Sequence, residues 1–175
     1  MNFPLLLLIA LFSLNAGCKK ENEDQLPPAT QTGAGTFGCK INGKVFVPQG
    51  YDGTGRPNPH VLYDVGVNGL PYLSINAGKF NSRTPAGYVF ISYGDLVSNG
   101  LYQYPQNFNF SVGWPEVLGS CFTAAFDSTI KKNGGGTITK FDPNNHIVSG
   151  TFAFKFKTAT CDTVYITDGR FDIKY

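Results

Sequence analysis

The chain has little of what enzymes most often use for catalysis. It holds two histidines, His60 and His146, and from residue 37 onward a single glutamate, Glu116. Neither histidine belongs to a local motif that pairs it with a serine or cysteine, and such pairs need the two side chains within hydrogen-bond reach. No catalytic residue is therefore predicted, and both histidines are expected at the surface.

Carboxylates are sparse as well. A glycosidase needs two of them on either side of the scissile bond, and only folding could bring a pair together from Asp52, Asp64, Asp95 or Asp127. The loop around Asp52 lacks the alternating acids of a calcium site. No Cys-x-x-C spacing indicates zinc. A glycoside hydrolase is kept only as an alternative function, and no metal or cofactor is predicted.

Charge of one sign is not in excess either. The chain has 14 Lys and Arg against 12 Asp and Glu, a net charge of +2. Beyond residue 36 the only adjacent basic pair is Lys131-Lys132. A nucleic-acid partner needs a basic stripe or patch, so no nucleic acid is predicted as a partner.

The chain also lacks an apolar run long enough to span a bilayer, which takes about 20 residues. Its longest apolar run, Phe3 to Leu14, suits instead the core of a signal peptide, which has about 7–15 residues. The block Leu14-Asn15-Ala16-Gly17-Cys18 at its end resembles the lipobox that is cut just before a lipidated cysteine. Asn15 departs from that pattern, and no Lys or Arg precedes the run. An ordinary cleaved secretory peptide is the alternative.

Lipidation at Cys18 would remove residues 1–17 and hold the rest of the chain to a membrane through acyl chains such as palmitate. We predict a lipoprotein of the cell envelope, anchored in the outer membrane with its domain on the periplasmic or cell-surface face. Residues 18–36 contain one large aliphatic side chain, Leu26, and no aromatic one. Such a segment buries too little apolar surface to fold, so it is predicted to be a flexible polar tether. Residues 37–175 are predicted to be one β-domain.

The pattern beyond residue 36 is typical of an all-β protein. Apolar residues alternate between turn signals, and no stretch keeps a helical period over three turns. Asn42-Gly43 and Asn68-Gly69 are expected to turn two hairpins. Residues 86–94 are expected to form a central strand, and residues 107–112 a strand with its apolar side chains inward. We predict an antiparallel β-sandwich of roughly nine or ten short strands, with an open barrel as the rival.

Further expectations concern the second half of the chain. Residues 121–127 are predicted to form a strand, and residues 131–136 a mobile loop. A hairpin is expected to turn on residues 143–145, with a bulge at Ser149-Gly150. The last segment is either a hairpin turned at Asp168-Gly169 or, as favoured here, one long strand bulged at Gly169.

Three segments carry a family resemblance. TFGCKINGKVFVP at 36–48, GGTITKFDPNNHIVSGTFAFKF at 135–156 and DTVYITDGRFDIKY at 162–175 resemble a family of bacterial lipoproteins known as domain of unknown function 6252. The similarity covers most of residues 36–175 and is strongest at the two ends. The resemblance implies a lipoprotein with a β-domain. That family has no assigned chemistry, so no catalytic residue is carried over.

Three cysteines lie in the predicted domain: Cys39, Cys121 and Cys161. In an exported protein this odd count allows one disulfide and a free thiol, or no disulfide. The resemblance implies a bridge between Cys39 and Cys161, because Cys39 lies in its first segment and Cys161 directly precedes its last. A bridge between Cys121 and Cys161 is the alternative.

Aromatic residues supply the predicted ligand surface. Tyr102, Tyr104 and Trp114 fall in or beside predicted loops, where they can form a platform for stacking a ligand. The alternative is that they fill the core, as aromatic side chains do in small β proteins. The predicted function is a non-catalytic β-domain with a binding or structural role. A glycan- or peptide-binding surface is the alternative, with a glycan or an envelope protein as partner.

Overall fold

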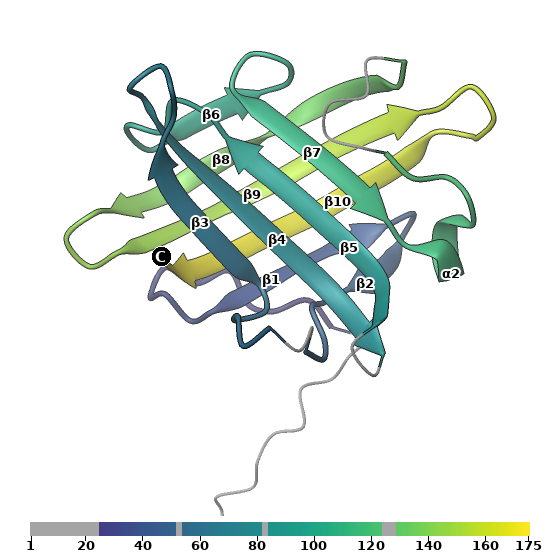
Figure 1. Ribbon diagram of the computed structural model, residues 1–175, viewed down its shortest axis with the longest axis horizontal. Coiled ribbons are helices and arrows are strands. Elements are labelled where there is room, and N and C mark those ends of the chain that lie inside the picture. Colours follow the sequence, from purple (N-terminus) through teal and green to yellow (C-terminus); the bar gives the residue numbers. More distant parts are fainter. Residues whose placement is uncertain (1–24, 52–53, 82–83, 124–128) are drawn as a thin grey trace, which may run out of the picture.

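The computed structural model describes residues 25–51, 54–81, 84–123 and 129–175. The predicted signal peptide and Cys18 lie outside these residues, and so do Asp52 and Asp127. The described chain folds into two antiparallel sheets that face each other, which confirms the predicted sandwich (Figure 1). In the part of the chain that is described, no helix combines the length and the apolar character needed to cross a membrane.

The larger sheet has six strands in the order β2-β1-β10-β9-β8-β6. Their bounds are β1 Thr36–Ile41, β2 Lys44–Phe46, β6 Gly100–Gln103, β8 Lys131–Asp142, β9 Ile147–Lys157 and β10 Val164–Lys174. The three longest strands of this sheet, β8, β9 and β10, are neighbours. They therefore form a broad surface on which the second sheet packs.

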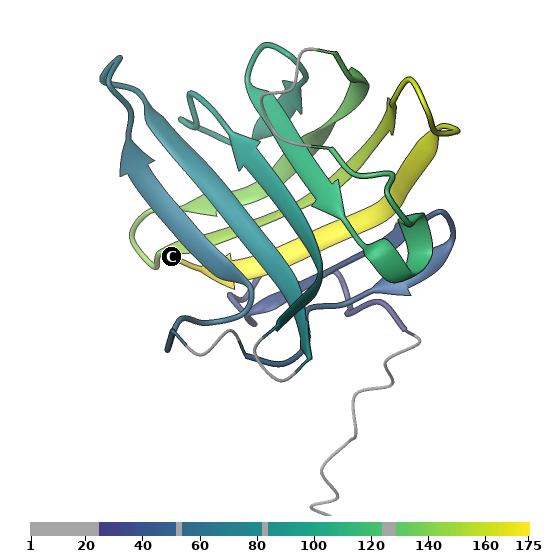
Figure 2. The ribbon, with the colours of Figure 1, turned by 45° about the vertical axis from the view of Figure 1, so that its right-hand side comes forward.

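The smaller sheet has four strands in the order β3-β4-β5-β7. Their bounds are β3 His60–Val65, β4 Pro71–Asn81, β5 Thr84–Tyr93 and β7 Phe108–Gly113, and one short helix, α2, spans Pro115–Leu118. In both ribbon views these strands run steeply across those of the larger sheet (Figure 2). The two sheets thus pack in the crossed arrangement known for orthogonal β-sandwiches.

Both predicted Asn-Gly turns are present. Asn42 and Gly43, between β1 and β2, have φ angles of 48° and 82°, the left-handed values that a type I′ turn requires. Gly69, between β3 and β4, has a φ of 76°. The predicted central strand is also confirmed, because β5 lies between β4 and β7.

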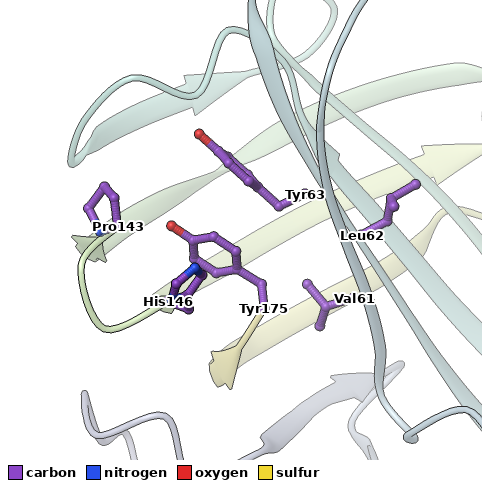
Figure 3. A pocket seen from close by; sticks show the side chains of 6 residues that line it. All are labelled: Val61, Leu62, Tyr63, Pro143, His146 and Tyr175. Atoms are coloured by element: carbon purple, nitrogen blue, oxygen red, sulfur yellow. The ribbon is translucent and has the colours of Figure 1, made fainter.

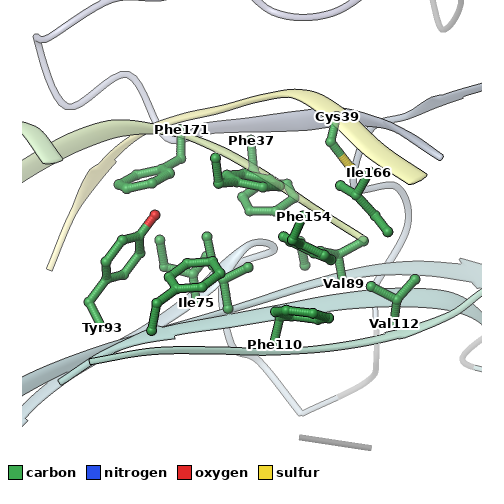
Figure 4. Close-up of a cluster of buried hydrophobic side chains, with 14 of the residues drawn as sticks. Phe37, Cys39, Ile75, Val89, Tyr93, Phe110, Val112, Phe154, Ile166 and Phe171 are labelled. Atoms are coloured by element: carbon green, nitrogen blue, oxygen red, sulfur yellow. The ribbon is translucent and has the colours of Figure 1, made fainter. Parts of the chain in front are cut away.

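Aromatic side chains from both sheets meet in the core (Figure 4). Alternation along β9 turns Phe152, Phe154 and Phe156 inward, and all three are buried. The Phe154 ring stacks on Phe110 of β7 with 3.9 Å between ring centroids. The predicted inward face of β7 is confirmed, since its buried side chains include Phe108 and Phe110.

The predicted bulge in the last strand is present. Ile166 pairs with Phe154 and Gly169 pairs with Phe152, so β10 has one more residue than β9 between these two pairs. The bulge predicted at residues 149–150 lies instead on the partner strand. The extra residue is in β8, between Ile138 and Lys140.

Two expectations for residues 121–136 are corrected. The predicted loop at 131–136 is the first half of β8. Its glycines allow neighbouring strands to approach closely, because a β-carbon on Gly135 would collide with the carbonyl oxygen of Tyr102, and one on Gly136 with the Tyr93 hydroxyl. Of the predicted strand at 121–127, the described residues 121–123 form no strand, and Thr123 makes an isolated bridge to Val112. Residues 124–128 lie outside the described residues.

Residues 25–35 differ from the predicted tether, because they pack on the larger sheet. The side chains of Leu26 and Pro27 cover Gly38, where an added β-carbon would lie 3.2 Å and 2.7 Å from them. Farther along, Gly33 donates its N–H to the Asp172 carboxylate at 2.7 Å. Composition alone predicts no packing here, since it counts apolar surface and not hydrogen bonds from the backbone to a distant carboxylate.

Candidate functional site

A pocket lies where β3, at the edge of the smaller sheet, faces the turn between β8 and β9 (Figure 3). Its volume is about 390 Å³, which is within the range of small-molecule sites. The lining residues are Val61, Leu62, Tyr63, Pro143, His146 and Tyr175. Each sheet thus supplies one wall, and the crossing of the two sheets opens a gap between them at this edge.

Aromatic rings form one side of the pocket. The Tyr63 and Tyr175 rings lie side by side, with 4.7 Å between their centroids. Phe141 on β8 stands behind both, 5.9 Å from Tyr63 and 6.2 Å from Tyr175. The His146 ring meets Tyr175 edge-on at 5.7 Å. Rings that support one another in this way keep their positions and present a firm apolar surface to a ligand.

One polar group on this wall has no partner. The Tyr175 hydroxyl is buried and makes no hydrogen bond within the described residues. Its burial, reinforced by nearby Tyr63 and Asp142, raises the pKa of this hydroxyl, so at neutral pH it carries its proton. An unpaired buried hydroxyl costs about 1–3 kcal/mol. A ligand oxygen that accepts this proton in a hydrogen bond would recover that cost.

Among the described residues, no carboxylate lines this pocket. Asp142 is near, but it accepts a hydrogen bond from Asn145 at 2.8 Å and lies 3.6 Å from the Lys140 ammonium. Hydrogen bonds from the side chain and the backbone of Asn145 are the main reason that the pKa of Asp142 lies below its usual value. Asp142 therefore stabilises the turn, and among the pocket's lining residues the one side chain that commonly serves in acid–base chemistry is His146.

The other described aspartates considered for a glycosidase each accept a hydrogen bond at the surface. Asp64 lies exposed on β3 and accepts the N–H of Val65 at 2.7 Å. Asp95, also exposed, accepts from Asn68 at 3.4 Å. Among described residues, no three His, Cys, Asp or Glu side chains gather into a cluster that could hold a metal ion.

The predicted stacking platform is wrong. Tyr102 is 5 % exposed and Trp114 is 6 % exposed. The Tyr102 hydroxyl donates to the Ser98 carbonyl at 2.9 Å, and the Trp114 ring packs edge-on against Phe46. Tyr104 is half-buried and packs against Phe110. The loop assignment failed because Tyr102 belongs to β6, whose alternation turns this side chain inward.

The disulfide joins Cys121 to Cys161. The implied bridge between Cys39 and Cys161 is therefore wrong, and the alternative pairing is the one found. Cys39 has a free, completely buried thiol, because the pleat of β1 turns it into the space between the sheets. Burial raises the pKa of this thiol far above its ordinary value, so it is not a reactive cysteine.

Sequence reasoning missed the residues that make the pocket. His146 is exposed, as predicted, yet it belongs to the pocket wall. The alternation of Val61 and Tyr63 in residues 60–65 was a signal that these two side chains share a face. Their meeting with Tyr175 depends on how the sheets cross, and no local pattern contains that information.

Comparisons with known proteins return no match: no family model, no curated protein and no solved structure matches the chain. The resemblance to the domain of unknown function 6252 family therefore stays a prediction. Any proposal about function has to rest on the geometry of the pocket and of the sheet edge beside it.

Proposed function

We propose that the protein is a binding domain of the cell envelope, held to the membrane by a lipid anchor at Cys18, and that its ligand occupies the pocket beside β3. One observation carries the proposal: the paired rings of Tyr63 and Tyr175, 4.7 Å apart, carry an unpartnered hydroxyl on Tyr175. This combination suits a ligand with a flat or apolar group to stack and an oxygen to accept one hydrogen bond.

Binding without catalysis is the reading that the pocket favours. Its walls hold aromatic and aliphatic side chains and one imidazole, and they offer no carboxylate. A glycoside hydrolase, the other class considered, needs two carboxylates facing a common space. Such a pair finds no support among the described aspartates.

The pocket is tested with two probes on the full chain. p-Cresol supplies a stackable ring, and methyl β-D-glucopyranoside supplies a sugar. We expect saturable chemical-shift changes with p-cresol, and at least a tenfold weaker binding in Tyr175→Ala. The matched control is Tyr165→Ala, because Tyr165 lies at the other end of β10 from Tyr175 and is 51 % exposed. Absence of saturable binding by both probes, or an equal loss in the control, would contradict the proposal.

Display on a membrane is tested separately. Cys18→Ala should abolish the incorporation of labelled fatty acid and move the protein from the membrane fraction to the soluble fraction. The lipid anchor would be refuted by a Cys18→Ala protein that still incorporates the label and still sediments with membranes. Neither result bears on the pocket, so display and binding are tested independently.

A further inference from the structure

The edges of the two sheets differ in how far they are open to another strand. An open edge presents unpaired N–H and C=O groups on which a further strand can add. Strands β2 and β6 have only three and four residues. The edge of β7 is engaged, because Val112 and Thr123 exchange backbone hydrogen bonds. Strand β3 has six residues, and within the described residues no segment pairs with its outer edge.

The register of β3 shows which of its groups face outward. Gly66 donates to Leu70 at 2.8 Å across the turn into β4. Antiparallel pairs alternate between hydrogen-bonded and non-hydrogen-bonded ones. Gly66 therefore belongs to a hydrogen-bonded pair, and so do the residues that precede it in steps of two, namely Asp64, Leu62 and His60. Their N–H and C=O groups point toward β4. The N–H and C=O groups of Val61 and Tyr63 therefore point away from β4, along the open edge.

The same two residues line the pocket. Val61 and Tyr63 turn their side chains toward the core and line the pocket on the β3 side, where the Tyr63 ring lies against that of Tyr175 (Figure 3). In a sheet, directly opposed residues on neighbouring strands put their side chains on the same face. A strand added to β3 would thus place the side chains opposite Val61 and Tyr63 into the pocket.

We propose that the ligand is an extended peptide, which adds to the open edge of β3 as a fifth strand of the smaller sheet and inserts an aromatic or large apolar side chain into the pocket. This inference rests on the proposed function and names its ligand class. Main-chain hydrogen bonds to Val61 and Tyr63 supply affinity, and the pocket selects the side chain, as in other peptide sites formed by strand addition.

Charge adds a second element of specificity. Asp64 lies on the outer face of β3, and its carboxylate reaches the edge, where it accepts the Val65 N–H at 2.7 Å. Opposite charges on neighbouring strands attract when they share a face. The peptide is therefore expected to alternate, with aromatic side chains toward the pocket and lysine or arginine on the outer face.

The probe is the amidated, acetylated peptide Lys-Phe-Lys-Phe-Lys, titrated into the full chain by calorimetry. We expect saturable binding. Methylation of both phenylalanine amide nitrogens, which face β3 in the added strand, should weaken binding at least tenfold. Methylation of the amide nitrogens of the second and third lysines, which face away from β3, should change it less than about twofold. These two peptides carry the same number of methyl groups and differ only in which side of the backbone is blocked.

Variants of the protein give the complementary test. Val61→Pro removes the outward N–H at an edge position, where proline is tolerated, and should weaken the peptide about tenfold. Val61→Ala is the matched control, since it trims the side chain and keeps the N–H. Tyr175→Ala should weaken both the peptide and p-cresol.

The outcomes separate the two levels of the proposal. If p-cresol binds but both methylated peptides bind like the parent, strand addition is wrong while the pocket stands. If neither p-cresol nor the peptide binds, the proposed function itself is wrong. Binding of methyl β-D-glucopyranoside with an inert peptide would make the ligand a glycan and overturn the inference. So would a dimer in sedimentation that Val61→Pro dissociates and that the peptide does not, because a second copy would then occupy the edge.

Discussion

Gly33 donates its backbone N–H to the Asp172 carboxylate at 2.7 Å, although 139 positions separate the two residues. The same carboxylate accepts from the hydroxyl groups of Thr30 at 2.6 Å and of Ser149 at 2.7 Å. Asp172 is itself only 1 % exposed. This one side chain thus fastens the segment before β1 to the last strand, and the part of the chain that packs on the sandwich begins before residue 37.

Replacing Asp172 should loosen that segment. Asp172→Asn turns amide hydrogens toward groups that donate, and it removes the charge that strengthens their hydrogen bonds. We expect the free energy of unfolding in urea to fall by about 2–4 kcal/mol, and the Gly33 amide to exchange faster. The control is Asp168→Asn, an exposed partner of Lys40 at 3.0 Å, which should cost much less. Equal losses in the two variants would contradict this role.

Stability should depend on pH through the same group. Burial opposes ionisation of Asp172, but hydrogen bonds from Thr30, Ser149 and the backbone outweigh it and hold the pKa below the ordinary 3.8. As the pH falls, the unfolded chain takes up the proton first, so the contribution is complete above about pH 5 and is lost progressively below it. The difference in unfolding free energy between wild type and Asp172→Asn should shrink from about pH 5 to pH 2. A constant difference would contradict the assignment.

The cysteines should behave very differently from one another. The Cys121–Cys161 bridge closes a loop with a sequence separation of 40, so replacing both residues by alanine should cost about 2–4 kcal/mol. Cys39 should resist iodoacetamide in the native protein and react once the chain is denatured. Peptide mass spectrometry distinguishes the two cases. A native protein with a labelled Cys121, or with Cys39 bridged to Cys161, would show the assignment to be wrong.

Gly136 should tolerate no side chain. A methyl group there collides with the Tyr93 hydroxyl inside the core, so Gly136→Ala should destabilise the protein by about 1–3 kcal/mol. Gly94→Ala is the matched control, because the nearest atom to its added methyl group lies 3.9 Å away. Thermal unfolding should show a lower midpoint only for Gly136→Ala. Indistinguishable midpoints would mean that the close approach at Gly136 is not needed.

Much of the fold could be predicted because its signals are local. Alternation marks the inward face of β9 at Phe152 and Phe154, and Asn42-Gly43 specifies its turn by conformation alone. Local signals mislead where distant neighbours decide the structure. The glycines at 134–136 look like a loop until the strands they touch are known. Trp114 looks available for a ligand until Phe46 covers it.

The candidate site could be predicted far less well. Tyr63, His146 and Tyr175 come from three separate parts of the chain, and only the crossing of the sheets brings them together. Each residue read alone has an ordinary explanation as a strand, turn or terminal residue. The open edge of β3 is equally non-local, since it exists because no described strand pairs there.

The most direct test of the pocket is an NMR measurement of contacts between bound p-cresol and the protein. The proposal predicts intermolecular nuclear Overhauser effects from the cresol ring to the Val61 methyl groups and to the His146 ring, because both line the pocket. Contacts confined to exposed aromatic side chains elsewhere, such as Tyr51 or Phe122, would contradict it. So would saturating p-cresol that gives no contact with Val61 or His146.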